Sequence, residues 1–161
     1  FIRLCDTFNI PIVSLVDEPG FLIGPDAEKA GTILHGTEAV LATTESTVPW
    51  TTVMIRKSFG VAAAAHYGPD GYVLAWPSAE SGPLPLEGGV AVAFKKEISE
   101  AEDPEAKRKE LEEKMAKNQN PFPRAEAFSV HEIIDPRDTR KYISLWAERI
   151  QSQLKASLMS R

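Results

Sequence analysis

The chain has 161 residues, of which 43 % are hydrophobic, and its formal net charge is −5. Such a composition is typical of a folded domain with a real core, and it argues against nucleic acid or an anionic membrane surface as the main partner. No apolar run approaches the ~20 residues that span a bilayer, and a single cysteine, Cys5, excludes an intrachain disulfide and favours a reducing compartment such as the cytoplasm.

The first third of the chain predicts a helix, a strand, a loop and a second helix. Residues 1–9 have helical apolar spacing and predict the end of a helix. Residues 10–16 are apolar apart from Pro11 and Ser14, which predicts a strand covered on both faces. The loop over residues 17–26 follows the carboxyl end of that strand, where open α/β sheets bind ligands, although a plain surface connection fits equally well. Residues 27–46 return to a helical pattern.

The chain is organised around residues 52–66, which read TVMIRKSFGVAAAAH. Residues 50–55 predict a buried strand, and the alanines from Ala62 to Ala65 predict a helix that starts soon after Gly60. The first N–H groups of a helix have no partner within it, and small side chains leave them open to an anion. Taken alone, an ordinary strand-to-helix turn is the favoured interpretation.

The second half continues the alternation of strands and helices. Residues 72–76 and 130–134 predict short strands, and the pattern from residue 135 onward predicts a final helix. Gly88 and Gly89 precede an apolar run that we interpret as a helix, and they either expose backbone donors to a ligand or allow close packing. Asp103 and Pro104 predict the start of a charged, solvated helix that runs to Asn118. The whole order predicts an α/β fold with a mostly parallel sheet.

Side-chain chemistry points to no metal site and to no catalytic triad. Cys5 and the histidines His35, His66 and His131 lack metal-ligand spacing. Ser58, His66 and Asp70 combine into a triad only on paper, and the G-x-S-x-G motif is absent. What remains are two helix starts lined by small residues, which suit chemistry through an enolate or another oxyanion.

Several motifs, in order along nearly the whole chain, resemble the carboxyltransferase subunit of biotin-dependent acyl-CoA carboxylases. The resemblance rests on residues 1–24 and on the short motifs His35-Gly36, Thr47-Val48-Pro49, Arg56-Lys57-Ser58-Phe59-Gly60, Ala75-Trp76-Pro77, Glu87-Gly88 and Ile134-Asp135-Pro136-Arg137-Asp138-Thr139-Arg140. It implies a crotonase-like fold with two such domains per subunit. Residues 1–161 would then be most of the carboxyl-terminal domain, with the amino-terminal domain absent.

The resemblance also implies an activity. In the family, carboxybiotin releases its carboxyl group, the biotin anion takes the α-proton of an acyl-CoA such as propionyl-CoA or acetyl-CoA, and the enolate attacks the released CO2. Implied partners are the acyl-CoA substrate, biotin carried on a partner protein or domain, the biotin carboxylase subunit and further copies of the chain. Because the active site forms between domains of two subunits, the fragment alone is expected to be inactive.

The implied site residues are backbone donors. The oxyanion pair of the second domain lies just after the R-K-[AS]-[YF]-G motif and falls on Val61 and Ala62, with Gly60 beside it. Gly88 and Gly89 are the other glycines expected to border the cofactor. Val61 departs from the family's usual Gly, and Ala63-Ala64 replace the Tyr-Asp of many propionyl-CoA carboxylases, so the resemblance leaves the acyl chain open.

Two further interpretations stay open on sequence grounds. A biotin-dependent acyl-CoA decarboxylase shares the resemblance. A non-catalytic assembly module fits the apolar final helix and the charged helix over residues 104–118. A hydratase or isomerase of the crotonase type fits less well, because the adjacent carboxylates Asp17 and Glu18 point to opposite sides of an extended chain.

Overall fold

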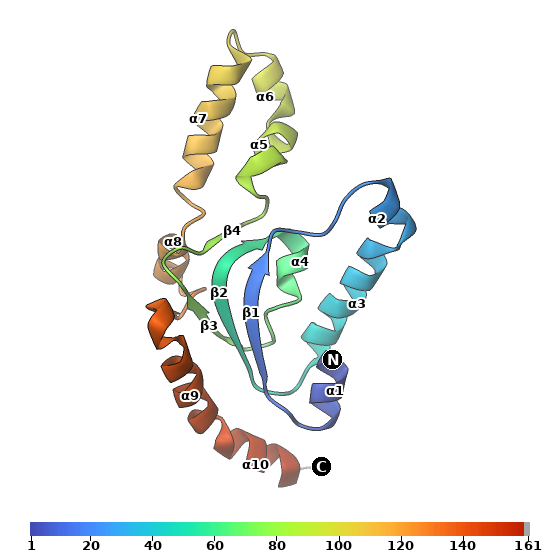
Figure 1. Ribbon diagram of the computed structural model, residues 1–161, viewed down its shortest axis with the longest axis vertical. Helices are drawn as coiled ribbons and strands as arrows, with labels where there is room; N and C mark the ends of the chain where they lie inside the picture. The colour runs from blue at the N-terminus through green and yellow to red at the C-terminus, as the bar shows by residue number, and fades with distance from the viewer. Residues whose placement is uncertain (160–161) are drawn as a thin grey trace.

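A single sheet forms the centre of the molecule (Figure 1). The computed structural model describes residues 1–159, apart from the side chains of residues 87, 157 and 158. Within that range the sheet has five strands, all paired in parallel: β1 (Ile12–Glu18), β2 (Trp50–Phe59), β3 (Tyr72–Ala75), β4 (Glu80–Gly82) and β5 (Glu132–Ile133). The predicted parallel α/β sheet is therefore confirmed.

The order of the strands is β1-β2-β3-β5, and β2 carries two neighbours on one side. Its first half pairs with β3 through Thr51–Met54, and its last residues pair with β4 through Lys57–Phe59. The register between β1 and β2 shifts after Val16, which marks a bulge that bends the sheet. Strand β2 is thus longer than the predicted residues 50–55, and β4 falls where sequence predicted only a turn-rich link.

Helices cover both faces of the sheet. One face carries α1 (Ile2–Thr7), α2 (Pro25–Lys29), α3 (Thr32–Glu45) and α4 (Gly60–Ala64), and the other carries α9 (Thr139–Arg149), continued by α10 (Gln151–Met159). On the α9 face, Val53, Leu74 and Ile134 form a buried cluster with Tyr142 and Ile143. On the α1 face, Cys5 packs with Ile12, Val48 and Trp50, which confirms the cysteine as a core residue.

The prediction that the first strand is covered on both faces is wrong for the described residues. Burial alternates along β1, with Val13 41 % and Leu15 56 % exposed. Helix α9 lies over β2 and does not extend across β1, which is the last strand on its side of the sheet. A continuous apolar run therefore predicted two covered faces where the described chain supplies only one.

The helix boundaries show where local chemistry overrides periodicity. The helix predicted over residues 27–46 is divided into α2 and α3 by Gly31, which has a φ of +73°. The helix predicted after Gly88 and Gly89 begins earlier, at Leu86, so both glycines lie within it. It divides at Phe94 into α5 (Leu86–Ala93) and α6 (Lys95–Ser99). Residues 121–126 form α8 (Pro121–Glu126), an element that the prediction lacked, and a 3-10 turn, η1 (Pro136–Asp138), precedes α9.

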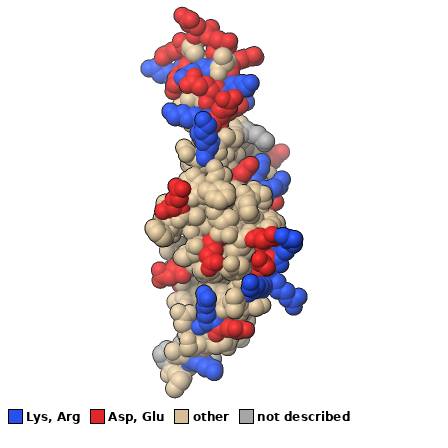
Figure 2. Space-filling model, turned by 90° about the vertical axis from the view of Figure 1, so that its left-hand side faces the viewer, with Lys and Arg blue, Asp and Glu red and all other residues tan. Residues whose placement is uncertain are grey.

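Helices α5 and α6 and helix α7 (Pro104–Ala116) project from the sheet as an arm (Figure 1). Asp103 caps α7 as predicted, accepting hydrogen bonds from the amides of Glu105 and Ala106, each at 3.1 Å. Leu111 is the buried residue of α7. Figure 2 shows acidic and basic side chains gathered at the end of this arm, which agrees with a solvated helix. No helix in residues 1–159 is long and apolar enough to cross a membrane.

Candidate functional site

The junction between β2 and α4 is the centre of the candidate site. Strand β2 ends at Phe59, and α4 begins at Gly60, within two residues of Val61 and Ala62 as expected. Gly60 has a φ of +64°, a conformation that favours glycine, and a side chain there would also approach the carbonyl oxygen of Pro83 at 3.4 Å. The glycine therefore allows the strand to turn directly into a helix.

Val61 and Ala62 supply the two backbone N–H groups of interest. Within residues 1–159, neither amide donates to a protein acceptor, as expected at the start of a helix. Their side chains differ in environment, because Val61 is 67 % exposed whereas Ala62 is 3 % exposed. Ala62 also lines a cavity of about 490 Å³ together with Ser14, Phe21 and His66. Both amides therefore lack a protein acceptor among the described residues, and of the two residues only Ala62 lines this cavity.

The carboxyl end of α4 is fixed by three side-chain donors from neighbouring elements. The hydroxyl of Thr43 donates to the carbonyl oxygen of Ala65 at 2.9 Å. The carbonyl oxygen of His66 accepts from the hydroxyl of Thr52 at 2.7 Å and from the indole Nε1 of Trp50 at 3.1 Å. Because α4 has only five residues, fixing its end also fixes the direction of the amides at its start. Sequence reasoning missed these residues, since threonines in a buried strand and a helix carry no recognisable motif.

The second pair of glycines lies close to the same end of the sheet. Gly88 has a φ of +86° and has open space around its Cα, whereas a side chain at Gly89 would meet Cβ of Leu84 at 2.8 Å. Gly60 and Gly89 therefore both border the link that contains Pro83 and Leu84. Close packing explains Gly89, and the role of Gly88 toward a ligand stays a prediction.

An ion pair joins the carboxyl ends of β1 and β2. The guanidinium Nε of Arg56 donates to both carboxylate oxygens of Asp17, at 3.0 and 3.1 Å, and the amide of Lys57 donates to the same group at 3.2 Å. The hydrogen bond from Arg56 holds the pKa of Asp17 below its usual value. The sequence predicted that Asp17 opens a loop that either binds a ligand or is a plain surface connection, whereas Asp17 lies in β1. The ion pair therefore ties the end of β1 to the Arg-Lys motif that precedes α4.

Ser58, His66 and Asp70, which were considered as a catalytic triad on sequence grounds, do not form one. Ser58 shares a hydrogen bond of 2.7 Å with the hydroxyl of Tyr67, and burial raises the pKa of that tyrosine. His66 Nδ1 instead lies 3.2 Å from the hydroxyl of Ser14. Among the residues that the structure describes, no group of three or more His, Cys, Asp or Glu side chains is arranged to hold a metal ion.

Comparison with known proteins gives this geometry a context. The carboxyl transferase domain family matches residues 1–159. The chain is 42 % identical over 161 residues to the carboxyltransferase subunit of propionyl-CoA carboxylase from Haloferax mediterranei, covering 97 % of this chain and 31 % of the relative. It is 41 % identical over 148 residues to the alpha subunit of methylmalonyl-CoA decarboxylase from Propionigenium modestum, covering 89 % of this chain and 28 % of the relative.

A solved structure shows the same fold. The crystal structure of transcarboxylase 12S, described as a hexamer with methylmalonyl-coenzyme A and methylmalonic acid bound, superposes with a TM-score of 0.83. The identity is 42 %, and the match covers 94 % of this chain and 30 % of that one. The chain therefore spans about a third of the length of the relatives it matches. On the match over residues 1–159, it belongs to the carboxyl transferase domain family.

Proposed function

We propose that the protein containing this chain transfers a carboxyl group between biotin and an acyl-CoA such as propionyl-CoA or acetyl-CoA, as the carboxyltransferase component of an acyl-CoA carboxylase. The observation that supports this most directly is the pair of unoccupied amide donors at Val61 and Ala62, at the start of a helix in a chain of the carboxyl transferase family. In this proposal residues 1–161 form most of the carboxyl-terminal of two crotonase-like domains.

The role of this chain is to bind and stabilise negative charge. An oxygen that becomes anionic during the reaction would accept hydrogen bonds from the Val61 and Ala62 amides, an interaction that strengthens as charge develops. The anchors at Thr43, Trp50 and Thr52 keep these amides in place, so little reorganisation is needed. Gly60, and with it Gly88 and Gly89, would keep the adjoining surface free of side chains.

Biotin suits this arrangement because its ureido oxygen can accept hydrogen bonds of the kind that backbone amides donate. When bound, biotin supplies the carboxyl group that is transferred. We propose that it arrives on a carrier protein or domain, together with a biotin carboxylase subunit, that copies of the chain assemble into an oligomer, and that the enzyme works in the cytoplasm. The hexamer described for transcarboxylase 12S supports the oligomer, and one lone buried cysteine supports a reducing compartment.

A decarboxylase is the second candidate, because the methylmalonyl-CoA decarboxylase alpha subunit is about as similar to the chain as the carboxylase subunit is. The same donors would serve either direction of carboxyl transfer. A non-catalytic assembly module is the third candidate, and the charged arm is the feature that favours it.

The test uses the full-length protein with its biotin-bearing partner. Exchange of labelled carboxyl between two acyl-CoA pools is measured beside net release of CO2 from methylmalonyl-CoA. Biotin-dependent exchange with little net release supports the carboxyltransferase, and dominant release supports the decarboxylase. If a folded, biotinylated complex shows neither exchange nor release, the assembly module is the candidate that remains.

A further inference from the structure

The outer edge of strand β1 has no strand beside it within residues 1–159. Strand β1 pairs with β2 and is the last strand on its side of the sheet. The amide of Ile12 donates to the carbonyl oxygen of Pro49 at 3.0 Å, in the direction of β2. Because consecutive residues of a strand point their backbone groups to opposite sides, the amides of Val13 and Leu15 point away from β2. These two amides are therefore placed to pair with a further strand.

The side chains at this edge are apolar and partly uncovered. Val13 and Leu15 are exposed on the face of the sheet where α9 lies over β2. Natural proteins protect a free edge with charged side chains, proline or a bulge, yet residues 7–16 carry no charge. Pro11 precedes the strand, and the bulge and the first charge come after Val16. The edge thus has the character of a strand inside a larger sheet.

Helix α1 leaves an apolar stripe on the same side of the molecule. Phe1, Leu4 and Phe8 follow helical spacing and are exposed. On the other flank of the helix, Asp6 accepts hydrogen bonds from the amide and the hydroxyl of Thr47 at 2.7 and 2.9 Å, and Thr47 leads into β2. At about 100° per residue, Asp6 and the stripe lie roughly 150° apart around the helix. The stripe therefore faces away from β2, beyond the edge of β1.

The connections within the sheet share one arrangement. The chain passes from β1 to β2 through α2 and α3 and from β2 to β3 through α4, and these helices lie on the same face of the sheet as α1 (Figure 1). Both connections step in the same direction, away from the outer edge of β1. Because crossovers between parallel strands keep one hand, a strand that entered β1 through α1 would lie one step to the other side of β1. That position is the free edge.

We propose that the outer edge of β1 pairs in parallel with a strand that leads into α1 and is supplied by residues that precede residue 1 in the full-length protein. This strand accepts hydrogen bonds from the amides of Val13 and Leu15, and the segment that joins it to α1 covers Leu4 and Phe8. The length of the relatives leaves room for it, since the chain spans about a third of them. The proposal does not rest on carboxyl transfer, so either can fail without the other.

The first test is hydrogen–deuterium exchange of the full-length protein, read by mass spectrometry at single residues. The amide of Ser14 is the internal control, because it points toward β2, as that of Ile12 does, and is paired in either case. We expect the amides of Val13 and Leu15 to exchange within ~10-fold of the Ser14 rate. If Val13 and Leu15 exchange like unprotected amides while Ser14 stays slow, no strand covers the edge and the proposal is overturned.

The second test identifies the occupant. The full-length protein is prepared with photo-leucine, an isosteric cross-linking analogue, and the peptides joined to position 15 are sequenced by mass spectrometry. Leu74 is the control, because it is buried against Val53 and Ile134 and should cross-link to their peptides. We expect Leu15 to cross-link within one chain to residues that precede residue 1. If Leu15 instead joins a second copy, which doubles the mass on a denaturing gel, or residues after 161, or forms no cross-link while Leu74 does, the proposal is wrong.

Discussion

The hydroxyl of Thr52 donates to the carbonyl oxygen of His66 at 2.7 Å, and through this bond a buried strand holds the carboxyl end of helix α4. The neighbouring residue, Thr51, forms a bond of the same kind to the carbonyl oxygen of Tyr72 at 2.8 Å, which lies in β3. Both threonines are fully buried in β2. Thr52 therefore anchors helix α4, whereas Thr51 anchors the neighbouring strand β3.

Replacing either threonine by valine should lower stability by a similar amount, about 1 kcal/mol, because each change removes one hydrogen bond to a backbone carbonyl. The carbonyl of His66 keeps the bond from the indole of Trp50. Only Thr52→Val should also lower kcat for carboxyl exchange in the full-length enzyme, by roughly 10- to 100-fold, since the oxyanion donors move with α4. Unfolding midpoints and steady-state kinetics of both variants check this. Equal kcat values for Thr51→Val and Thr52→Val would show that the anchor does not position the site.

The donors themselves are tested at Ala62. Ala62→Pro removes one N–H, yet proline is tolerated in the first turn of a helix, so the fold should persist. Loss of one such donor typically costs ~10²–10³ in rate. Ala62→Ser keeps the N–H and should be far less affected, which makes it the matched control. The measurement is carboxyl exchange by both full-length variants, with circular dichroism as the check on folding. Full activity in a folded Ala62→Pro variant would show that the amide of Ala62 does not stabilise an oxyanion in this reaction.

The isolated 161-residue chain should not catalyse carboxyl exchange. It spans 31 % of the propionyl-CoA carboxylase relative, and the family resemblance assigns part of the active site to another domain. The assay is biotin-dependent exchange by the purified chain, with the full-length protein as the positive control. Measurable turnover by the isolated chain would mean that residues 1–161 contain a complete site.

The Asp17–Arg56 pair should make a small, pH-dependent contribution to stability. The pKa of Asp17 is lowered in the folded protein from an ordinary value of 3.8. Its contribution is therefore present above about pH 4 and is lost as the pH falls through the lowered folded value. Both groups are substantially exposed, so solvent screening keeps the effect small.

The measurement compares urea unfolding of the parent and Asp17→Asn at pH 7 and at pH 2.5. The parent should be the more stable at pH 7, and the difference should shrink at pH 2.5. Glu38→Gln is a control, since Glu38 is exposed and lies near His35 and away from Arg56. A difference that grows on acidification would contradict the assignment.

Sequence predicted the elements whose determinants are local. The capped start of α7 at Asp103, the turn at Gly60 and the buried strand from Trp50 onward follow from capping, glycine conformation and apolar pattern. Strand β4 could not be predicted in the same way, because its three residues gain a strand partner only where β2 extends to Phe59, beyond the predicted residues 50–55. The position of Val61 and Ala62 came from resemblance to a family, and the structure adds that their helix starts where expected.

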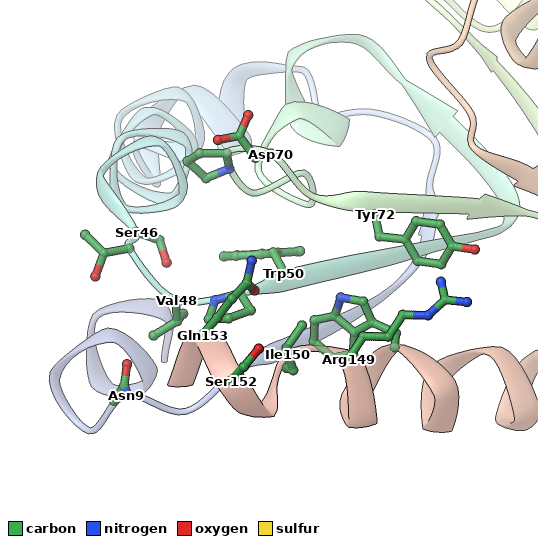
Figure 3. A pocket seen from close by; sticks show the side chains of 14 residues that line it. Asn9, Ser46, Val48, Trp50, Asp70, Tyr72, Arg149, Ile150, Ser152 and Gln153 are labelled. Atoms are coloured by element: carbon green, nitrogen blue, oxygen red, sulfur yellow. The ribbon is translucent and has the colours of Figure 1, made fainter. Parts of the chain in front are cut away.

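The anchors of α4 were beyond sequence reasoning for a different reason. Thr43, Trp50 and Thr52 lie on two elements, and their common target exists only after β2 and α3 have packed around α4. The same holds for the cavity of about 700 Å³ between the first residues of β2 and β3 and helices α9 and α10 (Figure 3), whose lining residues are up to 144 positions apart in sequence, from Asn9 to Gln153. Contacts between residues so far apart in sequence produce no periodic pattern that sequence analysis could recognise.

The outer edge of β1 has a consequence for how the isolated chain behaves in solution. Among the described residues, no strand pairs with the outer edge of β1 along residues 12–16, where the side chains of Val13 and Leu15 are exposed. The first charge on this strand is Asp17. An edge with so little charge is a template for pairing with another chain. Purified alone, the 161 residues should therefore self-associate in a concentration-dependent way, and lysine at position 13 or 15 should be the simplest remedy for aggregation.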